Sequence, residues 1–86
     1  MLLRDIQIIL NNFRRLGKVD VLTIDIIRAH QGTYHNDKTS ANKSWNSIFG
    51  KFLKSNERLL GISEIRKRVS AKDDDGNRTS CSRWAI

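Results

Sequence analysis

Apolar side chains recur every three or four positions at the start of the chain, which is the spacing of one face of an α-helix. Gly17 follows this pattern, at the position where helices commonly end. We therefore expect an amphipathic helix over residues 2–16. The residues expected to face the core are Leu2, Leu3, Ile6, Ile9, Leu10, Phe13 and Leu16.

The next segment, KVDVLTIDIIRAH, combines two shorter patterns. Val19 and Val21 alternate with their neighbours, as in a very short strand. Thr23 belongs to the residue types that cap helices, so we expect a second helix from Thr23 to about Ala29. The composition of residues 31–38 predicts a loop after it. The residues expected inside this helix are Ile24, Ile26 and Ile27.

A third helical pattern begins at Thr39 or Ser40, either of which can cap it. Asn56 or Gly61 is expected to break it, with Leu59 and Leu60 returning to the core. The residues of its apolar stripe are Ala41, Trp45, Ile48, Phe49, Phe52 and Leu53.

The C-terminal segment has the pattern of a β-hairpin, because Asp75-Gly76 is a strong signal for a two-residue turn. Pairing outward from this turn gives the partners Ala71 and Ser80, Val69 and Ser82, Lys67 and Trp84, and Ile65 and Ile86. One face then holds Ile65, Val69, Trp84 and Ile86. The other face holds Arg66, Arg68, Ser70, Lys72, Thr79, Cys81 and Arg83. A four-residue loop would keep these faces, whereas a three-residue loop would exchange them.

The order of helix, short strand, helix, helix and hairpin resembles the winged helix-turn-helix architecture of DNA-binding domains. The resemblance lies in element order and length and covers one domain, residues 1–86. It implies a mainly α domain with a C-terminal β-hairpin (α+β), in which the third helix enters the major groove and the hairpin is the wing. The loop before the third helix, about nine residues, is longer than the tight turn of that family.

The net charge of the chain indicates what kind of partner it binds. The 86 residues carry 16 Lys and Arg against 9 Asp and Glu, a formal net charge of +7. Most of the excess lies in residues 38–86, which suggests a scaffold half and a binding half. A domain this basic favours a polyanionic partner, although a charge excess can also serve solubility alone.

The stretch SANKSWNSIFGKFLKSN, residues 40–56, holds three lysines and no acid. Asn and Ser can contact base edges, and Lys can contact guanine or phosphate. Gly50, in the middle of this face, would let another backbone come close; an ordinary solvated helix face is the alternative interpretation. The candidate binding residues of this helix are Lys43, Asn46, Ser47, Lys51 and Lys54.

Arginines make the hairpin the second candidate surface, because Arg can grip phosphates or enter a minor groove. The alternative is that these charges keep an edge strand from pairing with another chain. Three acids at the tip, Asp73 to Asp75, are expected to avoid phosphates. The candidate binding residues of the hairpin are Arg66, Arg68, Arg78 and Arg83.

Enzymatic chemistry is not indicated, so we expect no catalytic residue, cofactor or metal. The loose spacing of His30 and His35 with the single Cys81 does not suit a zinc site. The run DDDGN has Ala71 and Ser82 where a calcium-binding EF-hand loop needs its first and last ligands. A lone cysteine, no signal-peptide pattern and no membrane-spanning run lead us to expect an intracellular protein, in cytoplasm, nucleoid or nucleus.

The sequence therefore predicts a small nonenzymatic DNA-binding protein, a regulator or an accessory to a larger machine, with duplex DNA as partner. RNA binding on the same basic surface is the first alternative. A protein-interaction module, an inhibitor or adaptor that docks on an acidic partner, is the second. Ile8, on the outside of the first helix, is the one feature that suggests a homodimer contact.

Overall fold

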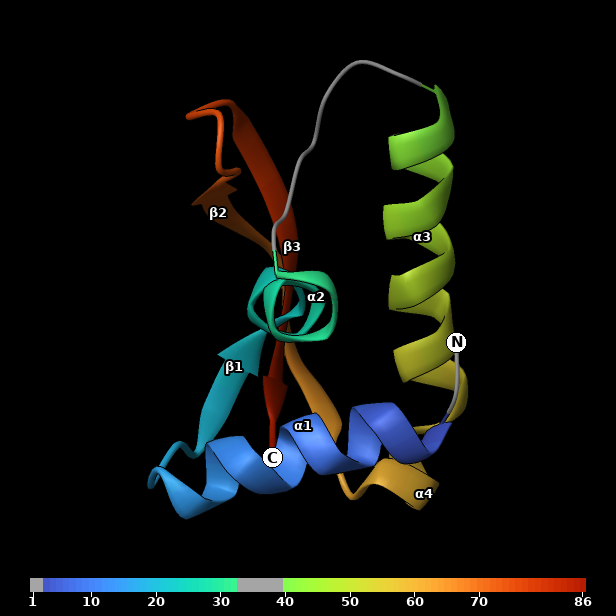
Figure 1. Ribbon diagram of the computed structural model, residues 1–86, viewed down its shortest axis with the longest axis vertical. Coiled ribbons are helices and arrows are strands. Elements are labelled where there is room, and N and C mark those ends of the chain that lie inside the picture. The colour runs from blue at the N-terminus through green and yellow to red at the C-terminus, as the bar shows by residue number, and fades with distance from the viewer. Residues whose placement is uncertain (1–2, 33–39) are drawn as a thin grey trace.

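The computed structural model describes the backbone of residues 3–32 and 40–86 and the side chains of residues 3–32 and 46–86. Within these ranges the chain forms four helices and a three-stranded antiparallel sheet. The elements are α1 (Leu3–Arg15), β1 (Asp20–Leu22), α2 (Thr23–Gln31), α3 (Ser40–Ser55), α4 (Glu57–Leu60), β2 (Ser63–Lys72) and β3 (Arg78–Ala85) (Figure 1). The expected α+β class with a C-terminal β-hairpin is confirmed.

The sheet order is β1-β3-β2, so the C-terminal strand lies in the centre and β2 lies at an edge. Val21 of β1 pairs with Trp84 of β3, which in turn pairs with Glu64 of β2. The short strand that the Val19 and Val21 pattern predicted therefore exists. Its role is to join the hairpin to the N-terminal part of the chain.

Glycines follow α1, α2 and α4 in a left-handed conformation, and the sequence indicated Gly17 after α1. The third helix ends at Ser55, next to Asn56, and Gly61 instead ends α4. Gly17 and Gly61 have φ angles of 82° and 69°, a left-handed conformation that glycine adopts without a Cβ clash. The Arg14 side chain of α1 donates hydrogen bonds to the carbonyl oxygens of Leu60 and Gly61 at 2.9 and 3.2 Å. This contact holds the end of α4 against α1.

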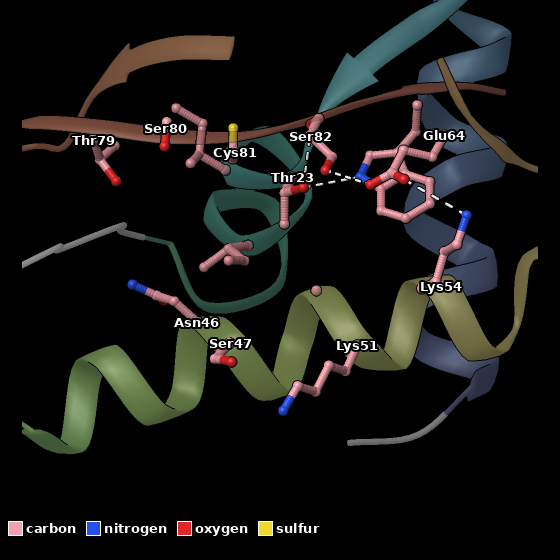
Figure 2. A pocket seen from close by; sticks show the side chains of 14 residues that line it. Thr23, Asn46, Ser47, Lys51, Lys54, Glu64, Thr79, Ser80, Cys81 and Ser82 are labelled. Carbon is pink, nitrogen blue, oxygen red and sulfur yellow. Dashed lines mark hydrogen bonds and ion pairs between the residues drawn. The ribbon is translucent and has the colours of Figure 1, made fainter. Parts of the chain in front are cut away.

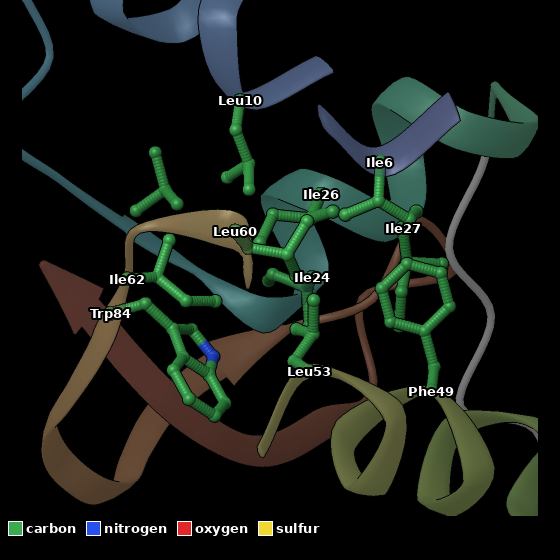
Figure 3. Packing of buried hydrophobic residues seen from close by; sticks show 11 residues of the cluster. Ile6, Leu10, Ile24, Ile26, Ile27, Phe49, Leu53, Leu60, Ile62 and Trp84 are labelled. Atoms are coloured by element: carbon green, nitrogen blue, oxygen red, sulfur yellow. The ribbon is translucent and has the colours of Figure 1, made fainter. Parts of the chain in front are cut away.

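The hydrophobic core lies where α1, α2 and α3 meet the sheet around Trp84, which is 1% exposed (Figure 3). Its indole Nε1 donates a hydrogen bond to Thr23 Oγ1 at 2.8 Å, and the Thr23 hydroxyl donates to the Ser82 carbonyl at 3.2 Å. The buried core residues are Ile6, Leu10, Val21, Ile24, Ile26, Ile27, Phe49, Leu53, Leu60, Ile62 and Trp84.

Thr23 does not cap α2, contrary to the expectation from its residue type. It is the first residue of the helix, and Leu22 occupies the N-cap position. Asp25 accepts the Leu22 N–H at 2.9 Å, so a carboxylate in the first turn satisfies this end of the helix. The Thr23 hydroxyl is turned toward the sheet because Trp84 and Ser82 supply its partners there.

The predicted hairpin register is wrong by one residue. β2 pairs Val69 with Cys81 and Ala71 with Thr79, rather than with Ser82 and Ser80. A three-residue loop, residues 74–76, replaces the expected two-residue turn, since the Asp73 N–H donates to the Asn77 carbonyl at 3.0 Å. An odd loop exchanges the faces of one strand, so Cys81 shares a face with Val69.

The Asp73 side chain explains the longer loop. Its Oδ1 accepts the backbone N–H groups of Asp75 and Asn77 at 3.0 and 2.7 Å, and the residue is 4% exposed. Gly76 completes the turn with a φ angle of 82°. The first acid of the acidic run is thus a structural part of the turn.

The far half of the hairpin departs further from the expected pairing. Register shifts lie between Glu64 and Arg66 and between Arg66 and Val69, so Lys67 is not opposite Trp84. Ile65 is 53% exposed and does not join the core.

Three other residues expected in the core are also outside it, with exposures of 76%, 56% and 69% for Leu16, Ile48 and Leu59. Leu16 follows the last residue of α1, and α4 is one turn long and buries Leu60 alone. Among the described side chains of α3, Phe49 and Leu53 alone are fully buried. The predicted inward positions of Ala41 and Trp45 lie outside the described side chains.

Replacing Thr23 with Val should lower the free energy of unfolding by about 1–3 kcal/mol, because the buried Trp84 N–H loses its acceptor at constant side-chain shape. Urea unfolding would measure the change. Trp84→Phe provides the partner of a double-mutant cycle, and the two losses should be clearly less than additive. Additive losses would show that the hydrogen bond is not the reason for the effect.

Replacing Asp73 with Ala should destabilise the protein by about 1–3 kcal/mol, since two backbone N–H groups lose a buried acceptor. Asp75→Ala removes the same charge from an exposed position of the same turn and should have a smaller effect. Thermal unfolding of both variants tests this difference. Equal effects would indicate that charge, and not the turn geometry, matters.

Candidate nucleic-acid interface

A hollow of about 380 Å³ separates α3 from β3, with α2 and Trp84 at its base. We call it the α3–β3 hollow. Figure 2 shows α3 along one side and β3 along the other. Its lining residues are Thr23, Ile24, Ile27, Asn46, Ser47, Gly50, Lys51, Lys54, Glu64, Thr79, Ser80, Cys81, Ser82 and Trp84.

The polar face of α3 forms one side of this hollow. Asn46, Gly50 and Lys54 follow one another at four-residue spacing, so they lie in one row on the helix. Ser47 and Lys51 form a parallel row and are both exposed. Four of the five candidate residues of this helix therefore lie together, and the side chain of the fifth, Lys43, lies outside the described residues.

Gly50 does not make room for another backbone of this chain. Apart from its own helix and chain neighbours, no atom of the described residues lies within 4 Å of the position that a Cβ would take. The missing side chain instead leaves open space in the middle of the hollow.

Asn46 carries an unused hydrogen-bond donor. Its Nδ2 atom is buried, and no described residue accepts a hydrogen bond from it. A buried donor without a partner is unfavourable by about 1–3 kcal/mol. An acceptor on a bound ligand, such as a phosphate or carbonyl oxygen, would satisfy it.

β3 supplies hydroxyl groups to the opposite side, at Thr79, Ser80 and Ser82 (Figure 2). Hydroxyls donate to phosphates and to base edges. These hydroxyls were not among the predicted contacts, since the candidate residues of the hairpin were all arginines. The sequence TSCS, residues 79–82, held the signal, since it places small polar residues on both faces of one strand.

Cys81 lies between these hydroxyls. Burial raises the pKa of its thiol, although the backbone N–H groups of Ile24 and Thr23 act in the opposite direction. The thiol is therefore protonated at neutral pH and is a poor nucleophile.

Glu64 is the one acid among the described lining residues, and it lies at one end of the hollow (Figure 2). Its carboxylate accepts a hydrogen bond from Ser82 Oγ at 2.5 Å and lies 3.5 Å from Lys54 Nζ and 3.9 Å from Lys67 Nζ. The Ser82 hydrogen bond lowers the pKa of Glu64, and both lysines act in the same direction. Its charge is thus balanced within the protein.

Lys54 has two carboxylate partners, since its Nζ also lies 2.8 Å from Glu57 Oε1. The hydrogen bond with Glu57 raises the pKa of Lys54. These contacts hold the ammonium group at the end of the hollow. Lys51, one turn earlier, is exposed and forms no ion pair with a described residue.

None of the candidate arginines lines the hollow. Arg66, Arg68 and Arg78 are exposed and lie outside the hollow. Arg83 forms an ion pair with Asp20 at 2.9 Å, so its first partner is β1.

An arginine that the sequence did not single out fixes the hairpin. Arg28 of α2 pairs with Asp74 at 2.9 Å and donates to the Lys72 carbonyl at 2.9 Å. The acids of the tip therefore serve the hairpin itself. Asp73 closes the turn, and Asp74 ties it to α2.

Comparison with protein-family models, with curated proteins and with solved structures gave no match for this chain. Within residues 3–32 and 40–86, no helix combines the length and apolarity that crossing a membrane requires. The same ranges contain no cluster of three or more His, Cys, Asp or Glu side chains suited to a metal ion.

Replacing Glu64 with Gln should lower the free energy of unfolding by roughly 1 kcal/mol at pH 7, because Ser82 and the lysines lose a charged partner. The pKa of Glu64 is lower in the folded than in the unfolded protein. Its stabilising contribution is therefore present at neutral pH and is lost as pH falls below the ordinary glutamate range.

Urea unfolding between about pH 3 and pH 7 tests this. In the Glu64→Gln variant, the free energy of unfolding should fall less steeply as the pH is lowered. Ser82→Ala removes the largest cause of the lowered Glu64 pKa, so it should reduce the same pH dependence in part. A wild-type pH profile in the Glu64 variant would contradict the assignment.

Proposed function

We propose that this protein is a nonenzymatic duplex-DNA-binding protein with a winged-helix-like arrangement, acting as a regulator or accessory factor. The observation that carries the proposal is the α3–β3 hollow. A basic, acid-free helix face and a strand bearing hydroxyls lie on its two sides, and its only described acid is paired.

The size of α3 suits a major groove. Its 16 residues span roughly 24 Å at 1.5 Å per residue, and the groove of B-DNA admits one helix. Ser47 and Lys51 are exposed on the side of α3 that borders the hollow. They are positioned to meet a base edge and a phosphate when the helix lies in the groove.

The hollow itself suits one phosphate strand. A strand passing between α3 and β3 would meet Lys51 on one side and the Thr79 and Ser80 hydroxyls on the other. Beside this strand, a base edge would supply the acceptor that Asn46 Nδ2 lacks among the described residues. These contacts combine a charge with neutral donors, which is the usual composition of phosphate sites.

The element order supports the winged-helix part of the proposal. Helix, short strand, two longer helices and a hairpin follow in the order on which the resemblance rests, with the one-turn α4 added before the hairpin. The hairpin is held to α2 through Arg28, so it would act as a fixed second contact beside α3. The wing tip carries acids, so the strands and not the tip would face DNA.

Salt-titrated affinities test the proposal, using a preferred duplex obtained by selection from random sequences. Asn46→Ala should weaken binding to the preferred duplex by about 1–3 kcal/mol and leave nonspecific binding nearly unchanged. Lys51→Gln should weaken all sequences about equally and reduce the slope of log affinity against log salt by about one unit.

Two variants serve as references in this experiment. Arg15→Gln removes one exposed positive charge from α1, outside the hollow, and should change affinity little. Glu64→Gln should raise the affinity for DNA, since it removes a negative charge from the hollow. Circular dichroism checks that this variant is folded.

Parallel titrations with duplex RNA and single strands complete the test. The deep, narrow major groove of A-form RNA does not admit a helix, so duplex DNA should bind more tightly. Tighter RNA binding would move the function to RNA. No binding to any nucleic acid at low salt would leave the protein-interaction module as the better description.

A further inference from the structure

Three consecutive basic residues, Arg66, Lys67 and Arg68, occupy the irregular part of β2. This strand lies at the edge of the sheet, and its register with β3 shifts on both sides of Arg66. All three side chains are exposed. β-Bulges bend a strand locally and redirect its side chains, and they are frequent beside functional sites.

Arg68 has a strained backbone. Its φ angle is 54°, and it is the only described non-glycine residue with a positive φ. Glycine adopts this conformation freely and Asn or Asp tolerate it, whereas a long side chain is disfavoured there. Residues held in such conformations are concentrated at functional sites.

The charge of Arg68 is also unused within the described protein. Lys67 lies 3.9 Å from Glu64, and Arg83, which pairs with Arg66 in the sheet, binds Asp20. No carboxylate of the described residues forms an ion pair with Arg68. Its guanidinium is free to meet an external anion.

We propose that residues 66–68 form a second phosphate-contact site for duplex DNA, outside the α3–β3 hollow, with Arg68 as its principal contact. This inference rests on the proposed function. Charge or a bulge can protect the edge of a sheet from pairing with another chain. If the bulge served this purpose alone, a glycine or asparagine at position 68 would form it without strain. The strained arginine indicates that the side chain itself is needed.

Arg68→Gly distinguishes DNA contact from protection of the sheet edge. Glycine adopts the same backbone conformation without strain and has no side chain to contact DNA. We expect its affinity for a DNA duplex of about 20 base pairs to fall roughly fivefold to tenfold near 0.1 M salt, with the salt slope reduced by about one unit. Its melting temperature should rise, by roughly 4 °C. Arg68→Lys should keep affinity within about twofold, since the charge remains.

Arg15→Gln is the matched control for losing one positive charge, and Lys51→Gln reports on the proposed function in the same assay. If Lys51→Gln weakens binding while Arg68→Gly behaves like Arg15→Gln, the second site is wrong and the proposed function stands. If neither variant weakens binding more than the control, both are wrong.

Two further measurements address other roles of Arg68. Sedimentation that shows self-association of Arg68→Gly, with wild-type DNA affinity, would assign the segment to edge protection and overturn the proposal. A melting temperature below that of the wild type would show that the side chain supports the fold, and would overturn the strain argument. A monomeric variant with weaker binding and a higher melting temperature is the result expected.

Discussion

The hydrogen bond from the Trp84 indole to the Thr23 hydroxyl is the contact on which the rest of this small domain depends. It joins the central strand of the sheet to the start of α2, and both residues are buried. An indole N–H inside a core needs an acceptor, and Thr23 supplies it while also bonding the Ser82 carbonyl. The position of β3 over α2, and with it the base of the hollow, follows from this pairing.

Incomplete coverage of α3 is the second feature that shapes the surface. Phe49 and Leu53 pack into the core, whereas the adjoining row of Asn46, Gly50 and Lys54 borders open space opposite β3. A helix packed on one narrow side keeps its remaining faces available to a partner. Among the described residues, the Asn46 Nδ2 donor in this row has no acceptor.

Most described acids form contacts within the protein, and this determines which basic side chains stay without an acidic partner. Asp25 satisfies the first turn of α2, Asp73 closes the hairpin turn and Asp20 pairs with Arg83. Glu64 is paired with Ser82 and Lys54. With these acids engaged internally, Lys51 and Arg68 are exposed and form no ion pair with a described residue.

The sequence by itself determined the three longer helices, the glycine that ends the first of them and the presence of a hairpin, because helical hydrogen bonds and tight turns form between residues close in the chain. Gly17 and the spacing of Ile6 and Leu10 were sufficient for α1. The sequence also placed Asn46, Ser47, Lys51 and Lys54 on one helix face, and the structure brings all four to the hollow.

Tertiary structure alone decided the hairpin register, the partners of the arginines and the hollow. The register depended on whether Asp73 turned its carboxylate back onto the loop, and one added loop residue exchanged the faces of a strand. Arg83 and Arg28 found partners more than forty residues away, at Asp20 and Asp74. Such contacts depend on how distant segments pack, and local periodicity holds no information about that packing.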